Sequence, residues 1–405
     1  MVLDIKSIFT TNFINLTLNQ GVNVIATLIY TPILFQTLGD ENYGLINLAF
    51  STLMIVSIFI SYGYNLNGPI KIANNDTNIQ NSIINNILSL RLTLAFIITI
   101  ICLPFIYFYI ENSFQKILFF SLIILINEAL NPLFLLQGLN KIFPQALINI
   151  FSKSIYIILL YLFLKFNNAY LANFFYGLSA SIVVLFFWLR YYNLNQLSFN
   201  FSFSEIKNLL NENFVLFLSS VSTHFTLNSA LIILSLFSSD KELGRFTLAY
   251  KIGFILRMIP VFFIQSSLQN ASNLNQNSKE KFNNYISKYF KIGLLLTFVI
   301  VIITNIFSDY IIYLFANEEI IYSSNILSLL SFIPFLAMLN FKNLVFILVN
   351  DLKSILNKAT FWTLIFMISS SLILSKFYGG IGLAYALLST EIFSFIIHYL
   401  LIKKR

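Results

Sequence analysis

The sequence predicts an all-α integral membrane protein of about twelve transmembrane helices, arranged as two six-helix halves. Hydrophobic residues make up 58% of its 405 residues and charged residues only 10%, with a mean hydropathy of +0.82. Soluble domains carry about 25% charged residues. The chain also contains twelve apolar runs, each close to the roughly 20 residues that cross a bilayer as a helix. The two halves repeat a set of matched positions.

Short polar connections separate the apolar runs. The first six runs lie at residues 12–38, 43–64, 87–110, 116–137, 143–165 and 169–190. The second six lie at residues 214–237, 244–268, 289–308, 322–349, 355–376 and 380–402. We expect one helix over each run, and the pattern is weakest at 308–322. The N-terminal stretch carries Asp4 and no A-x-A-like cleavage site follows, which predicts a retained first helix rather than a signal peptide.

The distribution of Lys and Arg predicts that both termini are cytoplasmic. With a cytoplasmic N-terminus, 16 of these cations fall in cytoplasmic connections and 5 outside, and an excess of Lys and Arg marks cytoplasmic loops. The cytoplasmic set includes Arg91, Lys141, Lys153, Arg190, Lys207 and Lys279. The cations that fall inside predicted spans are Lys251, Arg257 and Lys342.

The two halves match at an offset of 200 residues. The matched positions are Asp40 with Asp240, Arg91 with Lys291, and the Asn-rich connection 65–86 with 265–286. Two six-helix units in tandem share one orientation, so we expect halves 1–200 and 201–405 related by a pseudo-two-fold axis along the membrane normal. Parallel repeats of this kind place a transport pathway at the interface between the halves.

Deep charges in the apolar runs suggest where a substrate binds. They are Glu128, Lys251, Arg257, Lys342 and Glu391. A cation at the bilayer centre costs roughly 2.5–3.5 kcal/mol, so it persists by facing a bundle interior or a wet cavity. Lys251 and Arg257 are separated by about 9 Å of helix rise and about 120° of rotation, which lets both line one broad lumen. A cationic lumen indicates transport of an anion. The alternatives are pairing with a buried carboxylate or extension of the side chain to an interface.

Two of these charges lie near prolines in equivalent runs. Glu128 precedes Asn131-Pro132, and Lys342 follows Pro334. A proline leaves a carbonyl one turn earlier without its partner, and broken helices at transport sites turn such groups toward water or substrate. We therefore place Glu128, Asn131 and Lys342 among the candidate site residues. Pairing of Glu128 with Lys342 is the structural alternative.

Several chemistries are excluded or disfavoured. Histidine occurs only at the distant positions His224 and His398, so no H-E-x-x-H motif exists, and both are expected to be structural residues or polar sites within helices. The single cysteine, Cys102, excludes a disulfide framework and a cysteine metal site. There is no P-loop, no long extracytoplasmic loop for an enzyme site, and no clustered basic face for nucleic acid. We predict no catalytic residue, metal or cofactor.

Several segments resemble Wzx-type polysaccharide flippases. The first helices carry Leu18-Asn19-Gln20, Pro32, Leu38-Gly39, Tyr43-Gly44-Leu45 and Tyr62-Gly63-Tyr64-Asn65. Asn131–Asn140 resembles the fourth-helix P-x-x-x-x-Q-G segment of these proteins, which adds Gln137 to the candidate residues, although Phe134 stands where they often carry Trp. Leu243–Lys251 is similar to the segment that opens their second half, and Gly379-Gly380-x-Gly382 with Glu391 resembles their last helix.

This resemblance implies a fold and a substrate. The fold is that of MATE-like proteins of the multidrug/oligosaccharidyl-lipid/polysaccharide exporter superfamily. The substrate implied is an oligosaccharide linked to undecaprenyl by pyrophosphate, moved across the bacterial cytoplasmic (inner) membrane for O-antigen or related polysaccharide assembly. The substrate-binding candidates are Lys251, Arg257, Lys342, Glu128, Asn131 and Gln137.

Two alternative functions stay open at this point. One is an ion-coupled small-molecule exporter of the same fold, and the other is a membrane enzyme of glycan assembly such as a polymerase. The partners implied are the lipid-linked oligosaccharide and the membrane, with polysaccharide polymerase or assembly proteins and a coupling ion as further candidates. Neither the glycan carried nor the driving ion is encoded in a readable motif.

Overall fold

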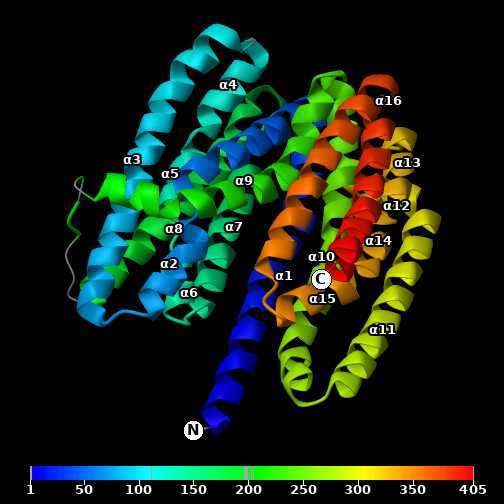
Figure 1. The fold of residues 1–405 in the computed structure, drawn as a ribbon. Helices are drawn as coiled ribbons and strands as arrows, with labels where there is room; N and C mark the ends of the chain where they lie inside the picture. The colour runs from blue at the N-terminus through cyan, green and yellow to red at the C-terminus, as the bar shows by residue number, and fades with distance from the viewer. Residues whose placement is uncertain (1, 111, 196–198, 202, 204, 405) are drawn as a thin grey trace. The chain divides into compact units, whose positions relative to one another are not determined.

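The computed structural model describes residues 2–110, 112–195, 199–201, 203 and 205–404, and within these ranges the secondary structure is entirely helical (Figure 1). The chain divides into two compact units, Met1–His224 and Phe225–Arg405. The helices of the first unit are α1 (Val2–Ser61), α2 (Tyr64–Ala73), α3 (Thr77–Tyr109), α4 (Asn112–Ser121), α5 (Ile123–Leu130), α6 (Leu133–Gly138), α7 (Phe143–Phe163), a 3₁₀ turn (Phe166–Asn168) and α8 (Tyr170–Leu194). Helix α9 (Ile206–Ser235) contains the boundary. The second unit continues with α10 (Asp240–Asn277), α11 (Lys279–Ile306), α12 (Ser308–Ala316), α13 (Ile321–Leu330), α14 (Ile333–Leu339), α15 (Phe341–Val349) and α16 (Lys353–Lys403).

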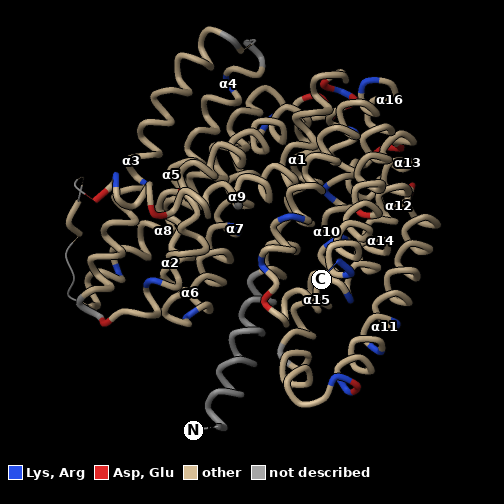
Figure 2. Tube along the Cα trace, viewed as in Figure 1, with Lys and Arg blue, Asp and Glu red and all other residues tan. Residues whose placement is uncertain are grey.

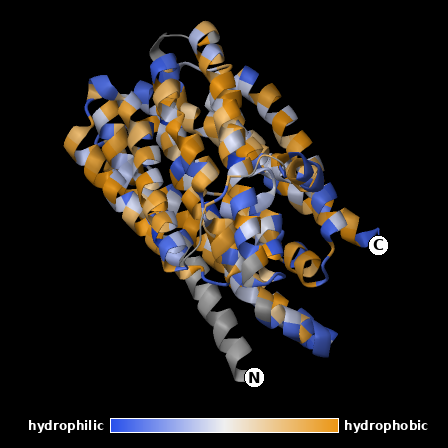
Figure 3. Ribbon diagram, turned by 90° about the vertical axis from the view of Figure 1, so that its left-hand side faces the viewer, coloured by the Kyte–Doolittle hydropathy of each residue, from blue (hydrophilic) through white to orange (hydrophobic). Residues whose placement is uncertain are grey.

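The helices have the length and composition of membrane spans. Among the described residues, nine helical segments are long and apolar enough to cross a bilayer, or ten if the bent pair Ile206–Leu218 and Ser220–Ser235 is one span. The helices are mostly hydrophobic, and hydrophilic segments lie near several of their ends (Figure 3). In α11, the charged residues gather in its first half and the remainder carries none (Figure 2). The predicted class, an all-helical protein with many membrane spans, is confirmed.

Two glycines interrupt the longest helices. Gly39 (φ 72°) breaks α1 and Gly379 (φ 55°) breaks α16, and residues other than glycine rarely adopt positive φ. These breaks separate the predicted runs 12–38 and 43–64, and 355–376 and 380–402.

The break in α16 is held by a carboxylate from α10. Glu242 Oε1 accepts hydrogen bonds from the Gly380 backbone N–H at 2.8 Å and from the Tyr322 hydroxyl of α13 at 2.7 Å. A negative charge at the start of a helical segment satisfies free N–H groups and is favoured by the helix dipole. Glu242 therefore connects three helices of the second unit.

The Asn-rich connections predicted at 65–86 and 265–286 are mostly helical, so that expectation was wrong. Helix α2 occupies much of the first connection, and α10 and α11 meet at Ser278 in the second. Amide side chains stabilise the turn between α2 and α3, because Gln80 Nε2 donates to the carbonyls of Ile72 and Asn75 at 2.9 and 2.8 Å. The tight approach of Gly68 to Phe134 packs α2 against α6. An Asn-rich composition favours turns, but in these segments tertiary packing favours helical structure instead.

The predicted spans 116–137 and 322–349 are both broken into short helices. In the first unit, α4, α5 and α6 are separated near Leu122 and at Asn131-Pro132. In the second unit, α13, α14 and α15 follow one another, with Pro334 in the first turn of α14. The helix breaks expected near the two prolines are therefore present.

Candidate functional site

The first unit contains a fully buried arginine. Arg91 of α3 has 0% exposure. Its Nη2 donates to Asn65 Oδ1 at 2.8 Å and its Nη1 donates to the Asn131 carbonyl at 3.2 Å. The guanidinium carbon lies 4.7 Å from the centroid of the Phe134 ring. Asn65 Nδ2 in turn lies 3.5 Å from Glu128 Oε1. We call Asn65, Arg91, Glu128, Asn131 and Phe134 the Arg91 cluster.

The cluster corrects the assignment of Arg91 to a cytoplasmic connection. A buried cation needs hydrogen bonds and a nearby negative charge to offset its lost hydration. Asn65 and the Asn131 carbonyl supply the hydrogen bonds, and Glu128 supplies the charge. Sequence reasoning missed Arg91 and Asn65 as members of this group. One signal was available, because Arg91 lies inside the predicted apolar run 87–110.

The backbone groups at the Asn131-Pro132 break are bound by side chains. Trp188 Nε1 of α8 donates to the Leu130 carbonyl at 2.7 Å, and Arg91 occupies the Asn131 carbonyl. Asn131 Oδ1 accepts from the Leu133 N–H at 3.2 Å. These groups were expected to face water or substrate, and the structure shows them satisfied within the protein instead, because two neighbouring helices reach the break.

In the second unit, Arg257 is paired with a carboxylate. Arg257 Nη2 of α10 lies 2.6 Å from Glu391 Oε1 of α16, and the two side chains are 34% and 12% exposed. Both line a small cavity of about 30 Å³, together with Tyr250 and Thr390. A volume of this size holds about one water molecule, so a pyrophosphate would need the pair to rearrange. Pairing with Glu391, one of the alternatives drawn from the sequence, is what the structure shows for Arg257.

The other candidate residues lie in different surroundings. Lys251 is half-buried in α10, six residues before Arg257. Lys342 is exposed in the first turn of α15, where its Nζ donates to Ser287 Oγ at 3.3 Å and lies 4.6 Å from the centroid of the Phe290 ring. Both of these contacts are with residues of α11.

Gln137 and the two histidines add little to a site. Gln137 is half-buried in α6, and its side chain makes no hydrogen bond to another described residue. His398 is 4% exposed, with Nδ1 2.7 Å from the Ser394 carbonyl oxygen and 3.2 Å from Asn340 Nδ2, which fits a structural histidine. His224 is half-buried in α9. Within the described ranges, no group of three or more His, Cys, Asp or Glu residues is arranged to hold a metal ion.

Comparison with known proteins decides the family. Residues 9–269, more than half of the chain, match the family described as "Polysaccharide biosynthesis protein". The chain belongs to this family. A relative from Escherichia coli (strain K12), named "Putative O-antigen transporter", is 26% identical over 254 residues. That match covers 59% of this chain and 59% of the relative, so it spans less than two thirds of the relative's length. The resemblance to Wzx-type flippases is confirmed.

Solved structures show the fold of this polysaccharide biosynthesis protein. The lipid II flippase MurJ in an inward closed conformation has a TM-score of 0.77 at 14% identity, covering 96% of this chain and 87% of that one. An inward-facing multidrug resistance MATE transporter has a TM-score of 0.71 at 16% identity, covering 94% and 95%. A transporter of the same superfamily from Pyrococcus furiosus has a TM-score of 0.67 at 16% identity, covering 98% and 96%. The protein is thus a multi-pass membrane protein with a MATE-like fold, and its relatives are named as transporters and a flippase, not as enzymes.

Proposed function

We propose that the protein is a flippase that moves an oligosaccharide linked to undecaprenyl pyrophosphate across the cytoplasmic membrane, for O-antigen or related polysaccharide assembly. The observation that carries the proposal is the polysaccharide biosynthesis family match over residues 9–269 on a chain with a transporter fold. The proposed mechanism is alternating access through a central cationic cavity, the mode that repeat-built transporters use.

Arg257 is the residue to which we assign the pyrophosphate. Its guanidinium can hold two oxygens of a phosphate group, as it can hold those of a carboxylate. Glu391 occupies it in the present structure. We propose that the pyrophosphate displaces Glu391 from Arg257. One anion then replaces another, and the positive charge of Arg257 keeps an anionic partner. Lys251 adds a second cation on the same helix, and Lys342 is a further candidate contact.

The remaining candidates have a supporting role in this proposal. Glu128 and Asn131 belong to the Arg91 cluster, which stabilises the first unit. Gln137 lies on the short helix that follows the Asn131-Pro132 break. We assign these three residues to the framework of the transporter rather than to direct contact with pyrophosphate.

A reconstituted transport assay tests the function. Liposomes containing the purified full-length protein receive undecaprenyl pyrophosphate that carries one fluorescently labelled sugar, and a membrane-impermeant reductant is then added. We expect bleaching of labelled lipid from both leaflets with the protein present, and from the outer leaflet alone in protein-free liposomes. Transport of a cationic dye without movement of the labelled lipid would instead favour the small-molecule exporter.

We further propose a twelve-span topology with both termini in the cytoplasm. Counting α1 and α16 as two spans each, at Gly39 and Gly379, and the bent pair in α9 as one, turns the nine candidate segments into twelve. Two halves, 1–200 and 201–405, would then be related by a rotation about the membrane normal. Arg91 and Lys153 lie within α3 and α7, yet removing both from the cytoplasmic count leaves a strong bias.

A reporter fusion tests this topology. Alkaline phosphatase is active in the periplasm and inactive in the cytoplasm, so a fusion after the C-terminal residue is expected to be inactive. A fusion to a cytoplasm-active fluorescent protein at the same position is expected to be bright. The reverse pair of results would refute the topology. The connection around Lys165 is expected to be periplasmic, so at that position the alkaline phosphatase fusion should be active and the fluorescent protein fusion dark.

A further inference from the structure

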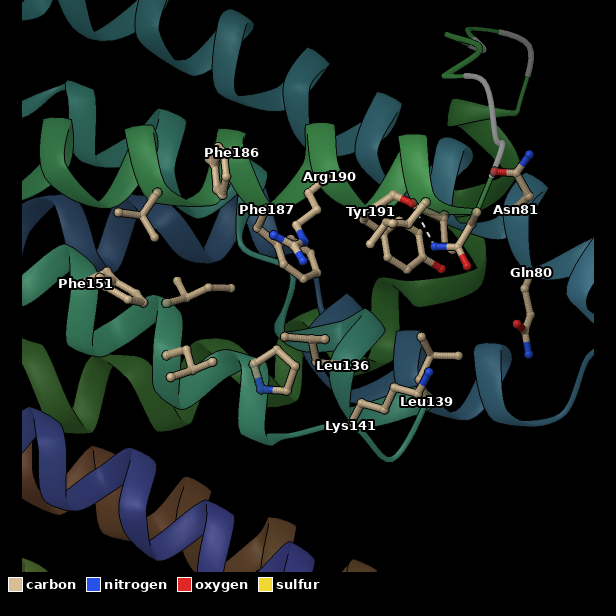
Figure 4. Close-up of a pocket in the computed structure, with 17 residues that line it drawn as sticks. Gln80, Asn81, Leu136, Leu139, Lys141, Phe151, Phe186, Phe187, Arg190 and Tyr191 are labelled. Carbon is tan, nitrogen blue, oxygen red and sulfur yellow. Dashed lines mark hydrogen bonds between the residues drawn. The ribbon is translucent and has the colours of Figure 1, made fainter.

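The first unit also contains a large cavity. It has a volume of about 840 Å³ and is lined by residues of α3, α6, α7 and α8 (Figure 4). This size is within the range of about 300–1,000 Å³ that is typical of ligand sites. None of the six substrate-binding candidates lines it. The cavity therefore needs an explanation of its own.

The cavity has a polar end and an apolar end. Arg190 and Tyr191 near the end of α8, Lys141 just after α6, and Gln80 and Asn81 near the start of α3 supply polar groups (Figure 4). The wall continues along the middle of α7 and α8. From Arg190 back to Val183, seven residues correspond to about 10 Å of helix. Phe151 and Phe186, which are exposed, line this apolar part together with Val183.

Two uncompensated cations distinguish the polar end. Its lining residues include Lys141 and Arg190 but no carboxylate. Neither cation forms a side-chain hydrogen bond or an ion pair with another residue of the described part of the chain. A ligand for this end therefore carries negative charge.

We propose that the cavity binds an anionic glycerophospholipid of the cytoplasmic leaflet, with its phosphate between Lys141 and Arg190. Both residues belong to the cytoplasmic set on the proposed topology, which puts the polar end at the level of the lipid headgroups. Basic pockets between transmembrane helices on the cytoplasmic side bind anionic lipid headgroups. An acyl chain of the lipid covers Phe151 and Phe186, which are exposed side chains.

The site is independent of the transported substrate and gives the protein a dependence on membrane composition. Arg190 extends from α8 toward the region of α6 and the loop after it (Figure 4). A phosphate held by both cations would link α8 to the α6–α7 connection. Anionic lipid is therefore expected to stabilise the first unit, and this effect needs no movement of the oligosaccharide.

Native mass spectrometry of the full-length protein tests the proposal. Purified protein is titrated with phosphatidylglycerol or with phosphatidylcholine, which has the same phosphate but no net charge. We expect retention of one phosphatidylglycerol molecule at concentrations where phosphatidylcholine is not retained. The double variant Lys141→Gln/Arg190→Gln is expected to bind it at least about tenfold more weakly, because each interfacial cation contributes about a factor of five to binding of an anionic lipid.

The control variant removes two exposed cations that do not line the cavity, Lys207→Gln/Lys279→Gln. It loses the same charge and is expected to bind phosphatidylglycerol as the unmodified protein does. If both double variants bound phosphatidylglycerol more weakly to the same extent, the lipid would be attracted nonspecifically and the proposed site would be refuted. If glycerol 1-phosphate displaced phosphatidylglycerol at equal concentration, the site would bind a phosphate group without requiring a lipid, which would refute the proposal. Tighter binding of undecaprenyl pyrophosphate, lost in the Lys141/Arg190 variant, would assign the cavity to the transport substrate instead.

Discussion

Replacing Arg257 by alanine is expected to lower transport of the labelled undecaprenyl pyrophosphate lipid at least about tenfold. The side chain is the assigned contact for pyrophosphate, and loss of a charged partner in a partly desolvated site costs about 1.4 kcal/mol or more, which corresponds to this factor. Arg257→Lys is expected to retain part of the activity, since lysine keeps the charge but not the paired contact. The initial bleaching rate in proteoliposomes measures the effect.

A double variant separates substrate binding from a structural role. Arg257→Ala leaves Glu391, which is 12% exposed, without its cation, so the variant is also expected to be less stable. Arg257→Ala/Glu391→Ala removes both charges and is expected to recover the yield of folded protein but not transport. Recovery of transport together with yield would show that Arg257 serves only as a partner for Glu391, and the assignment of pyrophosphate to it would fall.

The second large effect concerns the Arg91 cluster. Arg91→Met is expected to destabilise the protein by about 3–5 kcal/mol, because it removes the donor to Asn65 and to the Asn131 carbonyl and leaves the buried Glu128 without its nearby cation. For a unit of this size the loss corresponds to a fall of about 10 °C in the melting temperature. Thermal unfolding followed by intrinsic tryptophan fluorescence in detergent measures it. The double variant Arg91→Met/Glu128→Gln also removes the carboxylate and is expected to recover part of the lost melting temperature.

The 200-residue repeat predicted from the sequence supplies a matched control for this experiment. Lys291 stands 200 residues after Arg91 but is exposed on α11. Lys291→Met removes one cation at the equivalent position and is expected to leave the melting temperature within about 1 °C, as surface substitutions usually do. An equal fall in both variants would show that loss of charge, rather than loss of the buried hydrogen bonds, accounts for the effect of Arg91→Met.

The sequence predicted most of the fold because lipid imposes a simple rule. A span must be apolar and helical, so composition and run length locate helices directly. The breaks beside Pro132 and near Pro334 were also predictable, since proline cannot donate its hydrogen bond. Helix α2 was not predicted. Its ten residues include two Asn, one Gly and one Pro, and it is stabilised by packing of Gly68 against Phe134, 66 residues later in the chain.

The candidate site was predictable in composition but not in pairing. The charges of Arg257 and Glu391 were both identified as unfavourable in lipid. The two residues are 134 positions apart, however, and no local sequence pattern predicts their ion pair. Arg91 was misplaced because Asn85, Asn86 and Ser89 give its surroundings the polarity of a membrane interface. Its burial follows from the approach of α2 and α5, which is a tertiary property. Lys342 lies in a long apolar run, but a helix break exposes it on a short helix.

The break between α5 and α6 also bears on how the first unit can move. A proline break often acts as a hinge, but here Trp188 and Arg91 bind the two carbonyls on either side of Asn131. Bending at this point would separate both donors from their acceptors in an environment without water to replace them. We therefore expect that this break does not act as a hinge, and that the first unit bends elsewhere during a transport cycle. Backbone amides of α6 should accordingly exchange with deuterium slowly, and at the same rate with and without substrate.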